Sequence, residues 1–317
     1  MKKNRYVIVG LGKYGGKRLN SLNKNLKNSE LVGVFDTNLD QKFKELSSDM
    51  KIYSSLKEVF NDSNVDSIIL STPNNTHFDI CKETLLHGKN ILCEKPLGIN
   101  NDEVFKLKTL VLENPQLTLK MGSNLSYFPA LIKLKELLES NKIGQLVEVK
   151  SSIGHNGAYV KNSWHTSKEV SGGGSLIDNG VHLITYFNSI FDDLQLIESN
   201  LIKEDFEVES VAQLQLSSIQ CPSIKIESTW KKTDGYCEIE VKGSLGSLKV
   251  NVLNDEVIFL NDGKSSSIPC DEDLPSIDNE LIKFSEAIIE KKAIYPNISD
   301  AQNILNIIFK AYSSFEN

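Results

Sequence analysis

Three glycines near the start of the chain have a spacing that lets a backbone bind phosphate. Gly10, Gly12 and Gly15 form the pattern G-x-G-x-x-G, directly after an apolar run at residues 6–9 and at the start of a helical pattern. In that context the first glycine permits a tight turn, the second permits close approach of a pyrophosphate, and the third permits close packing of helix on strand. The free N–H groups at the helix start then face the phosphate. Alone the pattern is weak, because glycine turns between strands and helices are common.

Asp36 strengthens this interpretation. It ends the next apolar run, residues 31–35, and lies roughly 20 residues past Gly15, where dinucleotide-binding folds place an acid against the ribose 2′-hydroxyl. A carboxylate there repels a 2′-phosphate, so the sequence predicts NAD(H) and makes NADP(H) the less favoured cofactor. The alternative is an exposed aspartate in the turn at residues 35–38. The cofactor-binding residues predicted here are Gly10, Gly12, Lys13, Tyr14, Gly15 and Asp36.

Short apolar runs that alternate with helical patterns must position these residues. The runs expected to be strands are 6–9, 31–35, 67–70, 90–93 and 117–121. The segments expected to be helices are 13–26, 39–50, 56–60, 76–87 and 102–113. This alternation predicts an α/β domain, a doubly wound parallel sheet covered by helices on both faces.

The pattern changes near Gly122. A helix at 130–140 leads to a strand at 145–153 and a helix at 175–189, and residues 194–260 follow as successive strands with turns at 233–235, 243–244 and 254–255. Period-two alternation at 208–216 and 237–241 is typical of an antiparallel sheet with one face polar or used for packing. Helices at 278–291 and 299–315 close the chain. We expect two domains, residues 1–122 and 123–317, the second an α+β domain with a large, mainly antiparallel sheet.

Composition narrows the class of protein. The net charge is −7 with both signs mixed, so a nucleic-acid partner is not expected. No segment is long and apolar enough for a membrane span, and the apolar run at 6–9 is too short for a signal peptide, so we expect a cytoplasmic protein with no membrane partner. The five cysteines are widely spaced without a C-x-x-C pattern, which favours reduced, mostly buried thiols and predicts neither disulfides nor a metal site.

Three further segments carry a resemblance to a known family. They are Ser71-Thr72-Pro73-Asn74-Asn75-Thr76-His77, Cys93-Glu94-Lys95-Pro96-Leu97 and Gly172-Gly173-Gly174-Ser175-Leu176-Ile177-Asp178-Asn179-Gly180-Val181-His182. In this order, and over essentially the whole chain, they resemble the glucose-fructose oxidoreductase/inositol dehydrogenase (Gfo/Idh/MocA) family. The resemblance implies an N-terminal Rossmann domain. It also implies that the open face of the C-terminal sheet makes subunit contacts, in a homodimer or homotetramer.

The same resemblance implies roles for individual residues. Lys95 corresponds to a lysine beside the nicotinamide and the reacting hydroxyl, His182 to the acid/base, and Asp178 to an aspartate that orients substrate. The peptide bond before Pro96 is expected to be cis. The residues that this resemblance adds to the cofactor pocket are Thr72, Pro73, Asn74, His77, Glu94 and Lys95. For His77, in the first turn of a helix, capping or packing is the competing role.

The chemistry of these residues suits hydride transfer. Oxidising an alcohol also requires removal of the hydroxyl proton, and a histidine with an ordinary pKa of about 6.5 does this well near neutral pH. Asp178 and His182 are four residues apart in an expected helix and so share one face. Lys95 adds positive charge where alkoxide character develops. We therefore expect a sugar-like or polyol-like substrate carbon between the Asp178–His182 face and the nicotinamide.

The stretch from 154 to 171 resembles a long loop, and such loops often carry binding residues. Tyr159, Trp164 and His165 are candidates for substrate contact, with an ordinary surface loop as the alternative. Asn124 is a further candidate, within Gly122–Pro129. Many relatives have an arginine in a G-x-N-x-R-x-x-P pattern here, whereas this chain has Ser126 in its place. This difference puts in doubt the assignment of any one relative's substrate to this chain.

The leading hypothesis is an NAD-dependent oxidoreductase acting on a hydroxyl or keto carbon of a sugar, nucleotide sugar or polyol. Among these we favour nucleotide sugars. A second hypothesis is an NAD-binding sugar sensor or regulatory protein without turnover, which has no chemical need for Lys95, Asp178 and His182 together. A third is a reductase acting on a non-carbohydrate; such relatives often lose part of the Gly172–His182 motif, which is complete here.

Overall fold

The chain forms two compact units in the computed structural model, which describes residues 3–24, 26–39, 50–232, 234–271 and 274–315. Unit 1 comprises Met1–Ser123 and Ile277–Gln302, and unit 2 comprises Asn124–Ser276 and Asn303–Asn317. The sequence-based division at residue 122 did not include the return of Ile277–Gln302 to unit 1. Most of the helix expected at 39–50, and part of the turn expected at 233–235, lie outside the described residues.

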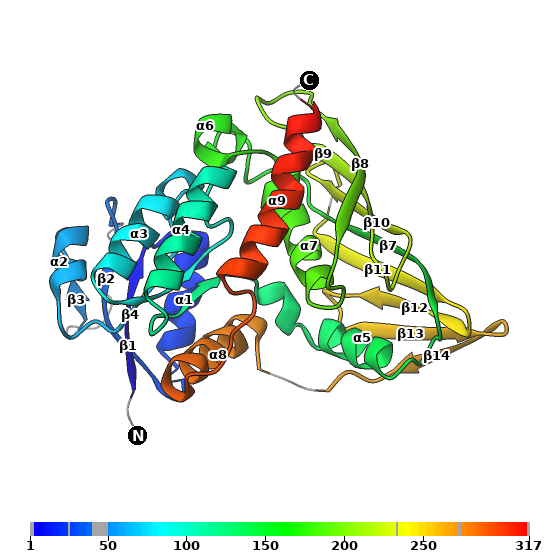
Figure 1. Cartoon of the computed structure of the whole chain (residues 1–317), viewed down its shortest axis with the longest axis horizontal. Coiled ribbons are helices and arrows are strands. Elements are labelled where there is room, and N and C mark those ends of the chain that lie inside the picture. Colours follow the sequence, from blue (N-terminus) through cyan, green and yellow to red (C-terminus); the bar gives the residue numbers. More distant parts are fainter. Residues whose placement is uncertain (1–2, 25, 40–49, 233, 272–273, 316–317) are drawn as a thin grey trace. The chain divides into compact units, whose positions relative to one another are not determined.

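In the described residues, unit 1 contains a six-stranded parallel sheet in the order β3-β2-β1-β4-β5-β6. Strands β1 to β4 are labelled in Figure 1. The strands are β1 (Asn4–Val9), β2 (Ser29–Phe35), β3 (Lys51–Ile52), β4 (Ser67–Leu70), β5 (Asn90–Cys93) and β6 (Leu119–Met121). Its helices are α1 (Lys13–Leu22), α2 (Leu56–Asn61), α3 (His77–Leu86), α4 (Asn101–Glu113) and α8 (Ser276–Glu290), with a 3-10 turn η2 (Asn74–Thr76). This is the doubly wound parallel fold that the alternating pattern predicted.

Register brings the carboxyl ends of neighbouring strands to one edge of this sheet. Val9 at the end of β1 pairs with Phe35 on β2 and with Leu70 on β4. Leu70 in turn pairs with Cys93, the last residue of β5. Each motif predicted to bind the cofactor directly follows one of these strands. In open α/β sheets, ligands bind at this carboxyl edge.

One face of the sheet in unit 1 packs against α1 and α8. Leu19 and Leu22 of α1 form a buried apolar cluster with β1 residues such as Tyr6, and Leu281 and Phe284 of α8 belong to the same cluster. Burial of large apolar side chains contributes roughly 1.5–3 kcal/mol each. Because α8 lies far along the chain from α1, this packing is the physical reason that the chain returns to unit 1.

Unit 2 is built on an eight-stranded sheet in the order β14-β13-β12-β11-β7-β10-β9-β8, antiparallel except for the parallel pair β7 and β10. The strands are β7 (Leu146–Gly154), β8 (Gln195–Ile202), β9 (Val211–Ser217), β10 (Ile224–Thr229), β11 (Tyr236–Gly243), β12 (Gly246–Asn251), β13 (Glu256–Asn261) and β14 (Lys264–Ile268). The helical segments are η3 (Asn124–Tyr127), α5 (Pro129–Glu139), η4 (Trp164–Thr166), α6 (Lys168–Ser171), η5 (Leu176–Gly180), α7 (Val181–Asn188) and the greater part of α9 (Ile298–Phe315).

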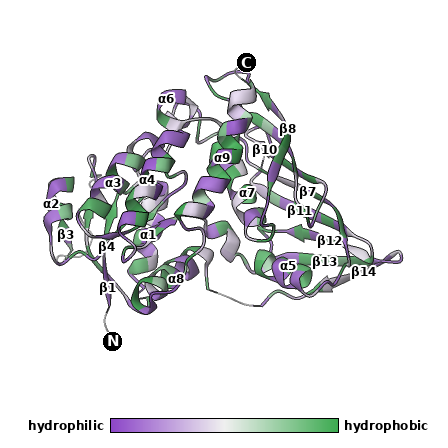
Figure 2. Cartoon of the chain, viewed as in Figure 1, coloured by the Kyte–Doolittle hydropathy of each residue, from purple (hydrophilic) through white to green (hydrophobic). Residues whose placement is uncertain are grey.

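The two faces of this sheet differ in polarity. In β11, Cys237, Ile239 and Val241 are buried, whereas Glu238 and Glu240, which alternate with them, are at least partly exposed. Figure 2 shows the same mixture of hydrophobic and hydrophilic residues along the strands of unit 2. Helix α5 packs against β12 and β13, and η5, which continues into α7, packs against β7, β9 and β10. The predicted mainly antiparallel sheet with one polar face is confirmed.

The helix expected at 175–189 differs from the prediction in its first turn. Leu176–Gly180 is a π-helical turn, closed by the bond from the Val181 N–H to the Leu176 carbonyl, and a regular α-helix follows at Val181–Asn188. A hydrophobic pattern with a period near 3.6 does not reveal one wider turn, so the sequence could not show it. Such turns occur frequently at functional sites.

Among the described residues, no helix has the length and apolarity needed to cross a membrane.

Candidate active site

The glycine loop after β1 fits a bound pyrophosphate. Gly10 has a φ of +89°, and a Cβ there would lie 2.6 Å from the Ser71 carbonyl oxygen. A Cβ on Gly15 would lie 1.9 Å from the Gly10 carbonyl oxygen, so both glycines are required by the fold itself. Gly12, the N-cap of α1, has open space around its Cβ position. That space, in front of the N–H groups of α1, is where a phosphate can approach the backbone.

Asp36 lies against this loop. Its Oδ2 accepts a hydrogen bond of 2.6 Å from the Leu11 N–H, and its Oδ1 accepts one of 2.7 Å from the Asn38 N–H. The carboxylate is therefore held beside the glycine loop, at the end of β2, as the dinucleotide pattern requires. The nearby Lys13 and Tyr14 are exposed on the first turn of α1, with Lys17 Nζ 4.9 Å from the Tyr14 ring centre.

The segments after β4 and β5 are joined by His77. Its imidazole is fully buried, with Nδ1 2.6 Å from the Pro96 carbonyl oxygen and Nε2 2.9 Å from the Thr72 carbonyl oxygen. Burial lowers the pKa of His77, and the two carbonyl contacts oppose that shift. His77 supports both segments from within the protein. Direct contact between His77 and the cofactor stays a prediction.

Lys95 is the second residue after β5, next to Glu94, and is partly exposed at the carboxyl edge of the sheet. The Lys95–Pro96 peptide bond is cis, as the resemblance implied. After β4, the Thr72 and Thr76 hydroxyls lie 2.6 Å apart, and the Asn74 side chain is buried. Unit 1 thus gathers the predicted cofactor residues along one edge of its sheet.

Asp178 in unit 2 sits within a frame of hydrogen-bond donors. Tyr159 Oη donates to Asp178 Oδ2 at 2.8 Å, and Trp230 Nε1 donates to the same oxygen at 3.1 Å. His155 Nε2 lies 3.6 Å from that oxygen, while His155 Nδ1 accepts from the Gly157 N–H. Since Nδ1 accepts, a neutral His155 carries its proton on Nε2, toward Asp178. The carboxylate is therefore held in one orientation.

Aromatic rings surround this frame. The His155 and Tyr159 rings are 4.4 Å apart between centres, Tyr159 contacts His165 edge-on at 5.5 Å, and His165 stacks on Trp164 at 3.8 Å. The structure thus brings the three predicted substrate residues of the 154–171 loop together near Asp178. The flat faces of these aromatic side chains can pack against the apolar side of a ligand ring, while the Asp178 carboxylate accepts hydrogen bonds from the hydroxyl groups of that ring.

His155 and Trp230 also belong to this cluster, although neither was among the site residues predicted from the sequence. Both follow the ends of strands that pair in parallel, because Gly154 at the end of β7 is opposite Thr229 at the end of β10. Their meeting depends on that one parallel pair in an otherwise antiparallel sheet. Strand order could not be deduced from the sequence pattern.

Glu209 holds the glycine-rich segment that leads to Asp178 and His182. Its buried carboxylate accepts hydrogen bonds from the N–H groups of Gly174 and Leu176, both 2.9 Å, and from Tyr312 Oη at 3.0 Å. Burial raises the pKa of Glu209, and these hydrogen bonds oppose that shift. A Cβ on Gly174 would lie 1.9 Å from the Glu209 carbonyl oxygen, which explains that glycine. His182 is partly exposed in the first turn of α7.

The remaining predicted substrate residue, Asn124, donates through Nδ2 to Ser276 Oγ at 3.0 Å. Ser126, at the place of the arginine in many relatives, has a buried hydroxyl without a hydrogen-bond partner. Lys95 belongs to unit 1, whereas Asp178 and His182 belong to unit 2. Their common action is therefore part of the proposal below.

A dinucleotide-type loop on a doubly wound sheet, joined to a mainly antiparallel α+β unit, defines a two-domain NAD-binding oxidoreductase class. The family model described as "Oxidoreductase family, NAD-binding Rossmann fold" matches residues 4–122, and "GFO/IDH/MocA C-terminal domain" matches 131–249. The chain belongs to the Gfo/Idh/MocA oxidoreductase family.

Individual relatives agree with this assignment. The chain is 29% identical over 215 residues to glucose-6-phosphate 3-dehydrogenase of Bacillus subtilis, covering 66% of this chain and 60% of that protein. It is 26% identical over 244 residues to an oxidoreductase of Schizosaccharomyces pombe, covering 74% and 65%. The matches thus span less than two thirds of these relatives' lengths. The structure of levoglucosan dehydrogenase with NADH and levoglucosan superposes with a TM-score of 0.86 over 99% of this chain and 98% of that one, at 16% identity, which shows the same fold.

Proposed function

We propose that this protein is an NAD-dependent dehydrogenase or reductase that transfers a hydride between nicotinamide and a hydroxyl or keto carbon of a sugar, nucleotide sugar or polyol. The observation that carries this proposal is the edge of the sheet in unit 1. There the open Gly12 position, the Asp36 carboxylate and Lys95 follow strands whose carboxyl ends are in register. A pyrophosphate, a ribose diol and a reacting carbon each have a group of suitable chemistry along it.

The bound cofactor supplies the hydride chemistry, and the side chains of this protein supply position, charge and proton transfer. His182 accepts the hydroxyl proton when the substrate is oxidised and returns it when the carbonyl is reduced. The Lys95 ammonium stabilises the negative charge that develops on that oxygen. Asp178, held by Tyr159 and Trp230, accepts a hydrogen bond from a neighbouring substrate hydroxyl and fixes the substrate ring.

The names of two similar proteins support a carbohydrate substrate. The Bacillus relative is named glucose-6-phosphate 3-dehydrogenase, and the structural neighbour is levoglucosan dehydrogenase, solved with NADH and levoglucosan. The aromatic cluster around Asp178 suits the apolar side of such rings. Within this class we favour nucleotide sugars, and the Asp36 carboxylate favours NAD(H) over NADP(H).

We also propose a homodimer or homotetramer that uses the polar face of the sheet in unit 2. This face carries charges of both signs, with Lys225 Nζ 2.8 Å from Glu148 Oε1 and Lys150 Nζ 3.4 Å from Glu148 Oε2. A surface of mixed charge can be complementary to its own copy across a two-fold axis. Light scattering should give a mass of two or four times 35.4 kDa, and a mass of 35.4 kDa at micromolar concentration would contradict this assignment.

Absorbance at 340 nm tests the activity. Purified protein is mixed with NAD⁺ and a panel of UDP-sugars, free sugars, sugar phosphates and inositols, and with NADH and the corresponding keto compounds. We expect NADH to appear or disappear with one substrate class. Absence of turnover in both directions across the panel, while NADH still binds by fluorescence, would reject the carbohydrate dehydrogenase and favour a sensor or a non-carbohydrate reductase.

A further inference from the structure

Four charged side chains from separate segments meet inside unit 1. Arg18 of α1 and Glu280 of α8 are 1% and 0% exposed, Lys120 of β6 is 0% exposed, and Glu94, at the end of β5, is 13% exposed. The two positive charges and the two negative charges of this cluster sum to zero. Removing such charges from water is costly unless each is paired. The least buried member, Glu94, lies at the cofactor edge of the sheet and directly precedes Lys95.

Glu280 is the centre of this cluster. Its Oε2 accepts from Arg18 Nη2 at 2.5 Å, and its Oε1 contacts Lys120 Nζ at 3.0 Å and accepts from the Ser123 N–H at 2.7 Å. Glu280 therefore already has Lys120 and a backbone donor. Arg18 is not needed to neutralise Glu280 alone.

The second partner of Arg18 explains the arrangement better. Arg18 Nε and Nη2 both donate to Glu94 Oε1, at 3.2 Å and 2.8 Å, as a fork of two donors on one oxygen. On the other side, a Cβ on Gly122 would lie 3.0 Å from Glu94 Oε2, so a larger residue at this position would crowd that oxygen. The Glu94 carboxylate is therefore held through Oε1 by Arg18, with Gly122 beside Oε2. At 13% exposure the Glu94 side chain is largely removed from water, so its pairing with Arg18 both compensates its charge and fixes its position.

Lys95 is thus flanked by two fixed neighbours. Glu94 is held by Arg18 and by the bond from its own N–H to the Leu70 carbonyl, 2.9 Å. Pro96 is held through its carbonyl by buried His77. A reactive group is placed reproducibly only when its supporting residues are themselves fixed by packing and hydrogen bonds.

We infer that Arg18, held by Glu280, is a positioning residue that fixes the Glu94 carboxylate and the adjoining Lys95 for contact with the nicotinamide half of NAD(H). This inference rests on the proposed function for the place of the nicotinamide. The inference assigns the two halves of the cofactor to two different groups of residues. The glycine loop and Asp36 serve the adenosine and pyrophosphate half, and the Arg18 cluster serves the nicotinamide half.

Calorimetric titration of the full chain with NADH and with ADP, which lacks the whole nicotinamide riboside, tests this separation. Arg18→Lys keeps the positive charge but removes the pair of donors to Glu94 Oε1. Glu94→Gln keeps the shape of the side chain but removes its negative charge, which weakens the contact with Arg18. We expect each variant to raise the Kd for NADH about tenfold or more. The Kd for ADP should stay within about twofold, because ADP contains only the adenosine and pyrophosphate half of the cofactor. Glu94→Gln, at the most exposed member of the cluster, keeps the test decisive if Arg18→Lys does not fold.

Asp66→Asn is the matched control, since it removes one charge from an arginine pair at the opposite end of the same sheet. It should leave both dissociation constants unchanged. Equal weakening of NADH and ADP binding in the folded Arg18 and Glu94 variants, or no weakening of either, would overturn the inference. Because binding requires no substrate, failure to find a sugar substrate would count against the proposed function and leave this test standing.

Discussion

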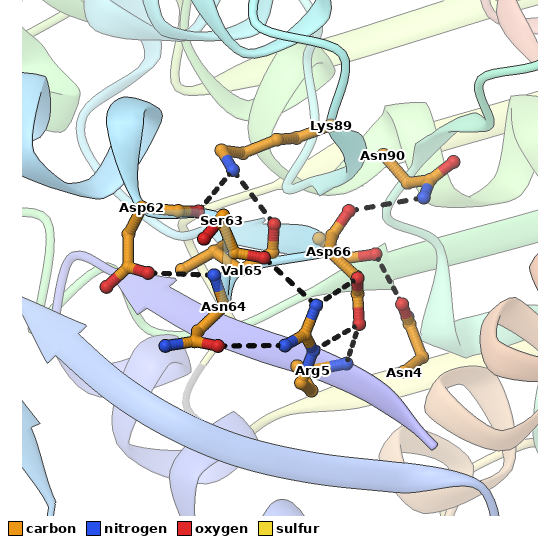
Figure 3. Close-up of polar contacts among 10 residues, drawn as sticks. Asn4, Arg5, Asp62, Ser63, Asn64, Val65, Asp66, Lys89 and Asn90 are labelled. Atoms are coloured by element: carbon orange, nitrogen blue, oxygen red, sulfur yellow. Dashed lines mark hydrogen bonds and ion pairs between the residues drawn. The ribbon is translucent and has the colours of Figure 1, made fainter. Parts of the chain in front are cut away.

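The two ends of the parallel sheet in unit 1 each carry an arginine paired with a carboxylate, but in different settings. At the amino end, Arg5 Nε and Nη2 donate to the two oxygens of Asp66, each at 2.8 Å, with the side chains 34% and 25% exposed (Figure 3). At the carboxyl end, Arg18 is 1% exposed and contacts Glu94 and Glu280. The same chemical pair is therefore partly solvated at one end and buried at the other.

The further partners at the amino end are largely main-chain groups of one loop. Arg5 Nη2 donates to the Ser63 carbonyl, and Lys89 Nζ donates to the carbonyls of Asp62 and Val65 (Figure 3). These contacts tie the loop before β4 to the starts of β1 and β5. At the carboxyl end, the ion pair instead leads to Glu94 beside Lys95. The direction of the strands decides which network serves the loop and which serves the ligand.

The largest expected difference between the ends is in turnover. Lys95→Ala, at the carboxyl end, and His182→Ala in unit 2 should each lower kcat by about 10²- to 10⁴-fold, since each removes a group that stabilises charge or moves the proton. Asp66→Asn, at the amino end, should leave kcat within about twofold. Steady-state rates at 340 nm, with NADH binding confirmed by fluorescence, measure this. Near-normal kcat in either alanine variant would remove that residue from the mechanism.

The next largest difference is in stability. Glu280→Gln leaves Arg18 and Lys120 buried without their shared carboxylate, and should lower the free energy of unfolding by about 3–5 kcal/mol. Urea titration followed by circular dichroism measures the loss. A decrease below about 1 kcal/mol would show that water or another group compensates these charges.

The dependence of stability on pH should also depend on the buried Glu280 carboxylate. Burial tends to raise the pKa of Glu280, but the charges of Arg18 and Lys120 outweigh it and lower the pKa from 4.5 to about 2. A lowered folded-state pKa gives stability that is complete above 4.5 and is lost as pH falls from 4.5 toward 2. The unfolding free energy of the wild type should fall through this window, and that of Glu280→Gln should fall less steeply. Parallel pH curves for the two proteins would contradict the assignment.

The smallest expected effect is at the amino end. Asp66→Asn keeps the shape of the side chain and removes one charge from a partly exposed pair, so it should cost about 1 kcal/mol of unfolding free energy. The loss should shrink in about 1 M salt, where such pairs are screened. A loss as large as that of Glu280→Gln would mean that the two networks are energetically alike.

Much of unit 1 was predictable because local sequence carries the necessary information. Each short apolar run became a strand of the parallel sheet, and each chemical motif follows its own strand, so one alignment of carboxyl ends brought Gly12, Asp36 and Lys95 to one edge. Helix ends were less certain: α1 ends at Leu22 and not at residue 26.

What the sequence did not show depends on contacts between distant residues. Arg18 and Glu280 are 262 positions apart, and only the folded chain shows that α8 returns to α1. The meeting of His155 and Trp230 at Asp178 likewise depends on the pairing of β7 with β10. Neither composition nor periodicity encodes such pairings, because many strand orders fit the same pattern of apolar runs.

Hydrogen–deuterium exchange of the full chain with and without saturating NADH tests the difference between the two ends most directly. We expect NADH to protect unit 1 at the glycine loop, at Asp36 and Asn38, and at residues 72–77 and 94–97. Exchange at the Arg5–Asp66 network should stay unchanged. Protection centred on that amino-end network, or none at the glycine loop while NADH is bound, would contradict it.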